Sequence, residues 1–183
     1  MKWYVLYTRH HHERAVYERL LGLGFQSYLP MAMVWRHSSR GVRRLTAPLL
    51  PRYVFVRCYL EMYAHLDLIS IPGAIQLLED GESQPLVVPD TEIRLLHLLC
   101  DGNGTLERVP NPVQGKPVTI VQGRLWGVSG VIKDGADPIL IVPLHVLGVS
   151  IAVEISQTQV VDGADAKAEL PFEPSHRRLT SER

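Results

Sequence analysis

The sequence has few cysteines and no long apolar run, and both absences exclude classes of protein. Only Cys58 and Cys100 occur among the 183 residues, in different segments, so we expect reduced thiols and a cytoplasmic protein rather than a disulfide framework. No apolar stretch reaches the roughly 18 residues that a membrane-spanning helix needs, which predicts no membrane segment. Residues 2–7 (KWYVLY) read as a strand, so no signal peptide is expected either.

Catalytic motifs are also missing. The sequence has no nucleophile elbow, no phosphate-binding Gly-Lys-Thr loop and no paired catalytic carboxylates. Three adjacent histidines, residues 10–12, cannot all face one ion, and no Cys or carboxylate stands nearby at metal-ligand spacing. We expect these histidines to lie in a polar loop that contacts phosphates. We expect no enzyme activity, no metal and no cofactor; an enzyme using these histidines is an alternative that no motif supports.

The net charge of zero conceals an asymmetry between the two halves of the chain. Residues 1–60 hold ten Lys or Arg against two acids, which leaves nine bases against seventeen acids in residues 61–183. From Arg36 to Arg57 there are six arginines and no carboxylate. Such a patch favours phosphate contacts with a nucleic acid. The alternative is a solvated loop that keeps the protein soluble.

The N-terminal part, residues 1–100, predicts an α+β domain with an antiparallel sheet and helices on one face. We expect helices over residues 13–23, 61–69 and 89–100, and strands over residues 3–7, 25–29, 31–35, 52–58, 75–78 and 85–88. In the strand 52–58, Val54 and Val56 suit the helix-covered side. Tyr7, Tyr53 and Phe55 then lie on the open face and predict a docking surface for an apolar protein partner. Alternatively, a loop or the C-terminal domain covers them.

The C-terminal part predicts a small β domain. Residues 101–114 lack periodicity and contain Gly, Asn and Pro, which indicates a linker. Five short strands fit between Val118 and Val161, and residues 163–183 read as a disordered tail. Residues 115–132, with glycines at 123, 127 and 130, resemble the KOW motif of SH3-like barrels in transcription and translation factors. An ordinary Gly-rich hairpin of another small barrel is the alternative.

Further motifs extend this resemblance to the N-terminal part. The segments KWYVLYTR (2–9), YLP (28–30), PLLPRYVFV (48–56) and Pro72-Gly73 occur in the order found in the N-terminal domain of NusG-family transcription elongation factors. The resemblance covers roughly residues 1–162 and is strongest to specialised paralogues, the RfaH-like and capsule-operon antiterminators. It implies a monomeric, non-enzymatic elongation or antitermination factor that docks on RNA polymerase and suppresses pausing or termination.

The resemblance also implies roles for residues of the N-terminal domain. Tyr7, Tyr53 and Phe55 match the apolar surface that seats the clamp helices of RNA polymerase. Arg9 and His10 match the basic edge turned toward non-template DNA. Three further arginines, in the variable hairpin of the family, are assigned to nucleic acid or polymerase by charge alone: Arg40, Arg43 and Arg44.

In the C-terminal domain, the resemblance implies a partner-binding loop surface. Its apolar positions, which meet ribosomal protein S10 or Rho in general NusG, are Leu125, Val128, Val146 and Leu147. Val149 stands where general NusG carries an arginine, which disfavours Rho. In RfaH-like relatives this domain can refold as a helical hairpin, but Pro117, Pro138 and Pro143 oppose a helix here and favour a barrel. A translation-associated, KOW-containing RNA-binding protein is the main alternative function.

Overall fold

The computed structural model describes residues 1–39, 41–102, 104–110, 115–133, 139–155 and 160–162. Arg40 and the predicted tail, residues 163–183, lie outside these ranges. The helices are α1 (Glu13–Gly22), α2 (Met62–Ile69) and α3 (Asp90–Cys100). The strands are β1 (Lys2–Thr8), β2 (Gln26–Tyr28), β3 (Met31–Ser38), β4 (Gly41–Pro48), β5 (Tyr53–Cys58), β6 (Ala74–Leu77), β7 (Val87–Val88), β8 (Thr105–Pro110), β9 (Lys116–Ile120), β10 (Ser129–Lys133), β11 (Ile139–Leu144), β12 (Val149–Glu154) and β13 (Val160–Asp162).

The first sheet has the order β2-β5-β1-β6, with β7 also paired to β1. Its central pair is antiparallel, and the register runs from Lys2↔Cys58 to Tyr7↔Tyr53. The strands and helices predicted for residues 1–100 are present, with bounds shifted by a few residues. Pro89 lies just before α3 in extended conformation, so the helix begins at Asp90, one residue later than predicted.

Helices cover both faces of this sheet, so the prediction of helices on one face is wrong. The face of Leu6, Val54 and Val56 shares a core with α1 and α2. The opposite face, which includes Phe55, belongs to a larger core that takes in α3. An apolar stripe such as that of α3 predicts that one side of a helix is buried, but it does not say against which sheet face.

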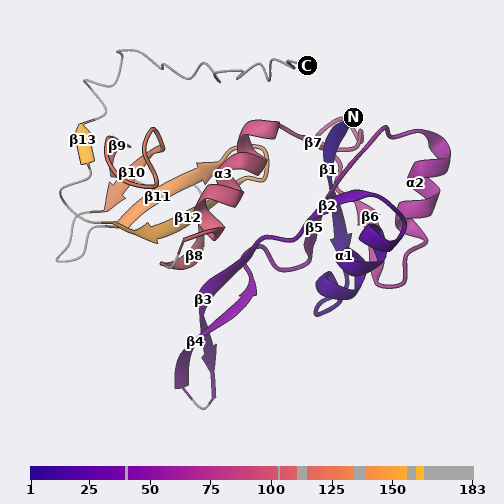
Figure 1. The fold of residues 1–183 in the computed structure, drawn as a ribbon, viewed down its shortest axis with the longest axis horizontal. Coiled ribbons are helices and arrows are strands. Elements are labelled where there is room, and N and C mark those ends of the chain that lie inside the picture. The colour runs from indigo at the N-terminus through magenta and orange to yellow at the C-terminus, as the bar shows by residue number, and fades with distance from the viewer. Residues whose placement is uncertain (40, 103, 111–114, 134–138, 156–159, 163–183) are drawn as a thin grey trace, which may run out of the picture.

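The second sheet joins parts of the chain that lie far apart in sequence. Its order is β13-β9-β10-β11-β12-β8-β3-β4. The hairpin β3–β4 projects from the N-terminal part, and β8 connects it to the C-terminal strands (Figure 1). The described residues between 116 and 162 form five strands, β9–β13, and five were predicted between Val118 and Val161. In the turn between β9 and β10, Gly123 and Gly127 adopt φ of 79° and 80°, which glycine tolerates best.

Strand β8 lies inside the predicted linker, residues 101–114. It pairs antiparallel with β12 and parallel with β3, so this part of the segment is a structured strand. The short alternation around Leu106 gave too weak a periodic signal for a strand. Among the described helices, none is long and apolar enough to cross a membrane.

Replacing Phe55 with alanine should destabilise the fold strongly. The ring is fully buried, and removing it leaves a cavity that costs about 3–5 kcal/mol. Urea unfolding followed by circular dichroism measures this. The control is Tyr59→Ala, since Tyr59 is 69% exposed and should change the unfolding free energy by less than about 0.5 kcal/mol. Equal midpoints for the two variants would contradict the packing described here.

Candidate functional site

Tyr7, Tyr53 and Arg52 form an aromatic–arginine cluster at one end of the first sheet. The antiparallel pairing places Tyr7 opposite Tyr53, and their rings meet edge to face with centroids 5.9 Å apart. The Arg52 guanidinium carbon lies 4.3 Å from the centroid of the Tyr7 ring, within cation–π distance. All three residues are half-buried, so the cluster is rigid and still accessible to a partner.

Arg52 is held in an unusual backbone conformation. Its φ is 71°, a left-handed value that costs a non-glycine residue about 1–2 kcal/mol. Its backbone N–H donates to Glu13 Oε1 at 2.8 Å, and its Nε donates to the Thr8 carbonyl at 3.0 Å. The Thr8 N–H donates back to the Arg52 carbonyl at 2.8 Å. These bonds fix the guanidinium over Tyr7, a role that sequence reasoning missed.

Phe55 shares a sheet face with Tyr53, as predicted, but it is not on the surface. Tyr28, whose ring lies 6.2 Å from Phe55, stacks on His97 of α3 at a centroid distance of 3.8 Å. Arg57, on the same face, approaches Asp90 of α3 at 3.6 Å. The fully buried Phe55 therefore lies in the core that α3 closes, so a helix covers it, whereas the alternative named a loop or the C-terminal domain.

The predicted basic edge lies beside the cluster. Arg9 and His10 are exposed at the end of β1. The Arg9 N–H donates to the Gly73 carbonyl at 2.8 Å, so the Pro72-Gly73 turn supports this connection. Gly73 has φ of 97°, and a Cβ there would lie 2.9 Å from the Cβ of His12. Within the described residues, no group of three or more His, Cys, Asp or Glu side chains could hold a metal ion.

The hairpin β3–β4 carries the other predicted arginines and an exposed tryptophan. Arg43 and Arg44 are exposed on β4, while Arg40 lies outside the described residues. Trp35, which is 42% exposed, stands opposite Arg44 in the register, and the Arg44 guanidinium carbon lies 5.5 Å from its ring. Sequence reasoning missed Trp35. Trp35 could have been identified from the sequence, because the residues around it are rich in arginine and include no acids.

The predicted partner-binding residues of the C-terminal part face inward. Leu125 and Val128 are buried, and Val146 and Leu147 are half-buried against the core shared with α3. The Val146 N–H donates to Glu92 Oε1 in the first turn of α3 at 2.9 Å.

A second contact lies at the other end of α3. A Cβ at Gly102, just beyond the helix, would collide with the Arg124 guanidinium. The turn between β11 and β12 and the turn between β9 and β10 therefore contact the two end regions of α3.

Two titratable side chains, Tyr28 of β2 and Cys100 of α3, lie next to each other. Burial raises the pKa of the Tyr28 hydroxyl far above its ordinary value, and burial also raises the pKa of the neighbouring Cys100 thiol. Burial likewise raises the pKa of Cys58, and both cysteines are free. These thiols stay protonated near neutral pH, which indicates a packing role.

The comparisons with known proteins agree with this architecture. The family described as transcription termination factor NusG matches residues 1–97, which is more than half of the chain. The chain belongs to the NusG family. The structure of NusG from Thermotoga maritima, described as showing domain interaction, has a TM-score of 0.55 and 24% identity, and the match covers 88% of this chain and 96% of that one. At this identity the likeness supports the fold.

Other matches are more distant. Conformation A of the MjSpt4:Spt5 complex has a TM-score of 0.31 and 14% identity, with 87% of this chain and 96% of that chain covered. Among curated proteins, none matches the chain significantly.

Arg52→Gly should be more stable than Arg52→Ala by about 1 kcal/mol. Both variants lose the side chain, but only glycine relieves the left-handed backbone at φ of 71°. Thermal unfolding of the two proteins measures the difference. At Arg43, on strand β4, the order should be reversed, because glycine weakens a strand relative to alanine. The same order at both sites would refute the strain assigned to Arg52.

Glu92→Ala should loosen the contact between α3 and the turn that joins β11 to β12. Hydrogen bonds to charged groups contribute about 1.5–3 kcal/mol, so exchange of the Val146 amide should accelerate about tenfold or more. Hydrogen exchange followed by NMR reads this amide directly. Thr91→Ala, at the exposed neighbouring position, is the control. Unchanged protection of Val146 in Glu92→Ala would show that the contact does not form in solution.

Proposed function

We propose that this NusG-family protein is a non-enzymatic elongation or antitermination factor of the specialised type that acts on RNA polymerase in the cytoplasm. The observation that carries the proposal is the aromatic–arginine cluster of Tyr7, Tyr53 and Arg52. Aromatic and arginine side chains dominate protein interfaces, and this cluster is fixed before binding, which lowers the entropic cost of association. It seats the clamp helices of the polymerase.

Docking at the cluster explains how the protein suppresses pausing and termination. A factor that binds the closed, processive state of the polymerase more tightly than the open state shifts the population toward it. The exposed Arg9 and His10 flank the cluster and contact phosphates of the non-template strand. The hairpin arginines Arg43 and Arg44, together with Arg40, extend this basic surface toward nucleic acid.

The C-terminal strands form a KOW-type, SH3-like barrel that recruits a second protein. Ribosomal protein S10 is the favoured partner, and Val149 in place of arginine disfavours Rho. Val146 and Leu147 must leave α3 before such a partner can bind them, since both pack toward the core that includes this helix. Once they are released, the connection through residues 101–114 keeps the barrel near the polymerase at high effective concentration.

The docking surface is tested by capture of purified RNA polymerase on the monomeric, immobilised protein. Tyr7→Ala and Tyr53→Ala should each weaken capture by at least about tenfold, because hot-spot residues contribute 2 kcal/mol or more. Tyr59→Ala is the matched control, an exposed tyrosine just beyond β5. Phe55→Ala is unsuitable here because its ring is buried in the core.

Two outcomes would contradict the proposal. Unchanged capture by both Tyr7→Ala and Tyr53→Ala would remove the cluster from the interface. Capture of ribosomes in place of polymerase from a mixture of the two would favour the translation-associated alternative.

A further inference from the structure

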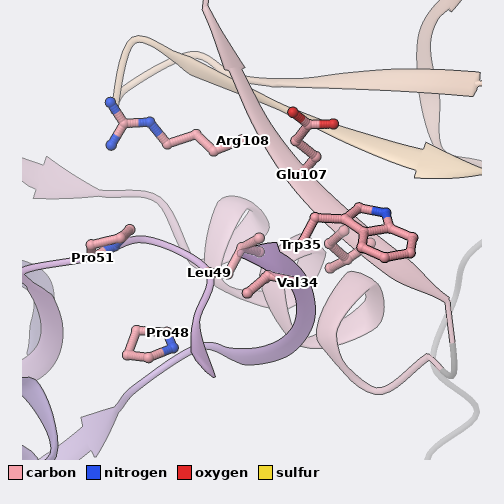
Figure 2. A pocket seen from close by; sticks show the side chains of 8 residues that line it. Val34, Trp35, Pro48, Leu49, Pro51, Glu107 and Arg108 are labelled. Atoms are coloured by element: carbon pink, nitrogen blue, oxygen red, sulfur yellow. The ribbon is translucent and has the colours of Figure 1, made fainter. Parts of the chain in front are cut away.

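A pocket of about 290 Å³ lies where the β3–β4 hairpin meets β8. The residues that line it come from three segments: Val34, Trp35, Pro48, Leu49, Pro51, Leu106, Glu107 and Arg108. In Figure 2, Trp35 and Glu107 lie on one side of the pocket, Arg108 and Pro51 on the other, with Leu49 and Val34 between them. Nothing in the proposed docking on polymerase uses this pocket.

The pocket arises from the way two parallel strands separate. The pairing of β3 with β8 consists of Met33↔Thr105 and Val34↔Leu106. Beyond this point β8 continues along β12, with Glu107 opposite Ala152, whereas β3 continues into the hairpin with β4. Trp35 and Glu107 are the next residues on the two strands, so they line the opening where the strands separate. The buried Leu49 and Leu106 line the bottom of the pocket.

The pocket is lined by the Trp35 indole, by the charged side chains of Glu107 and Arg108, and by apolar side chains at its bottom. Trp35 pairs with Arg44 of β4 on one side, and its indole is 42% exposed where β3 has separated from β8. Arg44 lies over the same ring at 5.5 Å, which brings a cation next to the aromatic surface. Glu107 and Arg108 are both exposed and add one acceptor group and one donor group to the pocket.

The positive charge of the β3–β4 hairpin favours a negatively charged ligand. Residues 31–48 contain four arginines and no carboxylate, so a polyanion is attracted along the whole hairpin. Aromatic rings beside arginines are the usual platform for unpaired bases, because every base has a π-face to stack on. A duplex cannot present such a face, which limits the ligand to single strands.

We propose that this pocket binds one unpaired base of a single-stranded nucleic acid. The base stacks on Trp35, and the adjacent phosphate contacts Arg44, which stands opposite Trp35 on the same face of the hairpin. The Glu107 carboxylate accepts a hydrogen bond from an exocyclic amino group, as carboxylates do from N4 of cytosine. The pocket consequently prefers cytosine to thymine or uracil, which carry a carbonyl oxygen at that position. The inference rests on the proposed nucleic-acid contact of the hairpin and is independent of polymerase docking.

Binding is measured by fluorescence anisotropy with labelled 12-nucleotide oligomers of dC, dT, rC and rU and the full chain, without polymerase. Trp35→Ala should weaken binding of the C oligomers about tenfold, the size expected for one lost stacking contact. Trp35→Phe should restore most of the affinity. Trp126→Ala is the matched control, since Trp126 is 54% exposed in the turn between β9 and β10 and should bind as the wild type does.

Two further variants separate base recognition from charge. Glu107→Gln should abolish the preference for C over T by strengthening the binding of T, because the amide oxygen accepts from N4 of cytosine and the amide nitrogen donates to O4 of thymine. Arg44→Ala should weaken all oligomers equally and make the salt dependence shallower by about one unit of slope. A preference for DNA or for RNA oligomers would identify the strand that the pocket takes, and either result supports the proposal.

The proposal is overturned if the wild-type chain binds none of the oligomers at low salt, or if Trp35→Ala and Trp126→Ala bind equally well. It is also overturned if Glu107→Gln keeps the full preference for cytosine. None of these results bears on the proposed docking to RNA polymerase, which is tested separately with Tyr7→Ala and Tyr53→Ala. Capture of polymerase by Trp35→Ala shows that the variant is folded.

Discussion

The antiparallel pairing of β1 with β5 determines which side chains the rest of the molecule can use. Its register runs from Lys2↔Cys58 to Tyr7↔Tyr53, and a slip of one residue would exchange the two faces of both strands. In the observed register, one face meets α1 and α2 and the other meets α3. Only the end of the second face extends beyond α3, and Tyr7 and Tyr53 meet there. The same pairing thus builds the core and leaves the aromatic–arginine cluster at its edge.

Helix α3 has a comparable role between the two sheets. It covers Phe55 on one side, and near its two ends it contacts Val146 and Arg124 of the C-terminal part. The helix therefore occupies apolar surface that each half of the protein would otherwise offer to partners. Any molecule that binds these covered surfaces must first separate the contacts with α3, and this free energy reduces its affinity.

Most elements could be predicted from the sequence because their signals are local. The alternation in residues 53–58, the spacing of Ile93, Leu96 and Leu99, and Pro89 before the helix each specify one element. The position of Arg52 could not be predicted, because its left-handed backbone depends on Glu13, which is 39 residues away. The burial of Phe55 depends in the same way on α3 and not on its neighbours in the strand. Strand β8 is short, and it forms because β12 and β3 offer it two edges.

The joint between β3 and β8 has a mechanical consequence. Two residue pairs hold it, whereas eight hold β3 to β4 and five hold β8 to β12. With only two residue pairs, it is the least extensive strand pairing in the sheet that runs from the hairpin to the C-terminal strands. A force on the tip of the β3–β4 hairpin acts at a distance of several residues from the β3–β8 pairing and loads that pairing most. Strain applied by a bound strand would therefore separate the hairpin from β8 before any helix had to move.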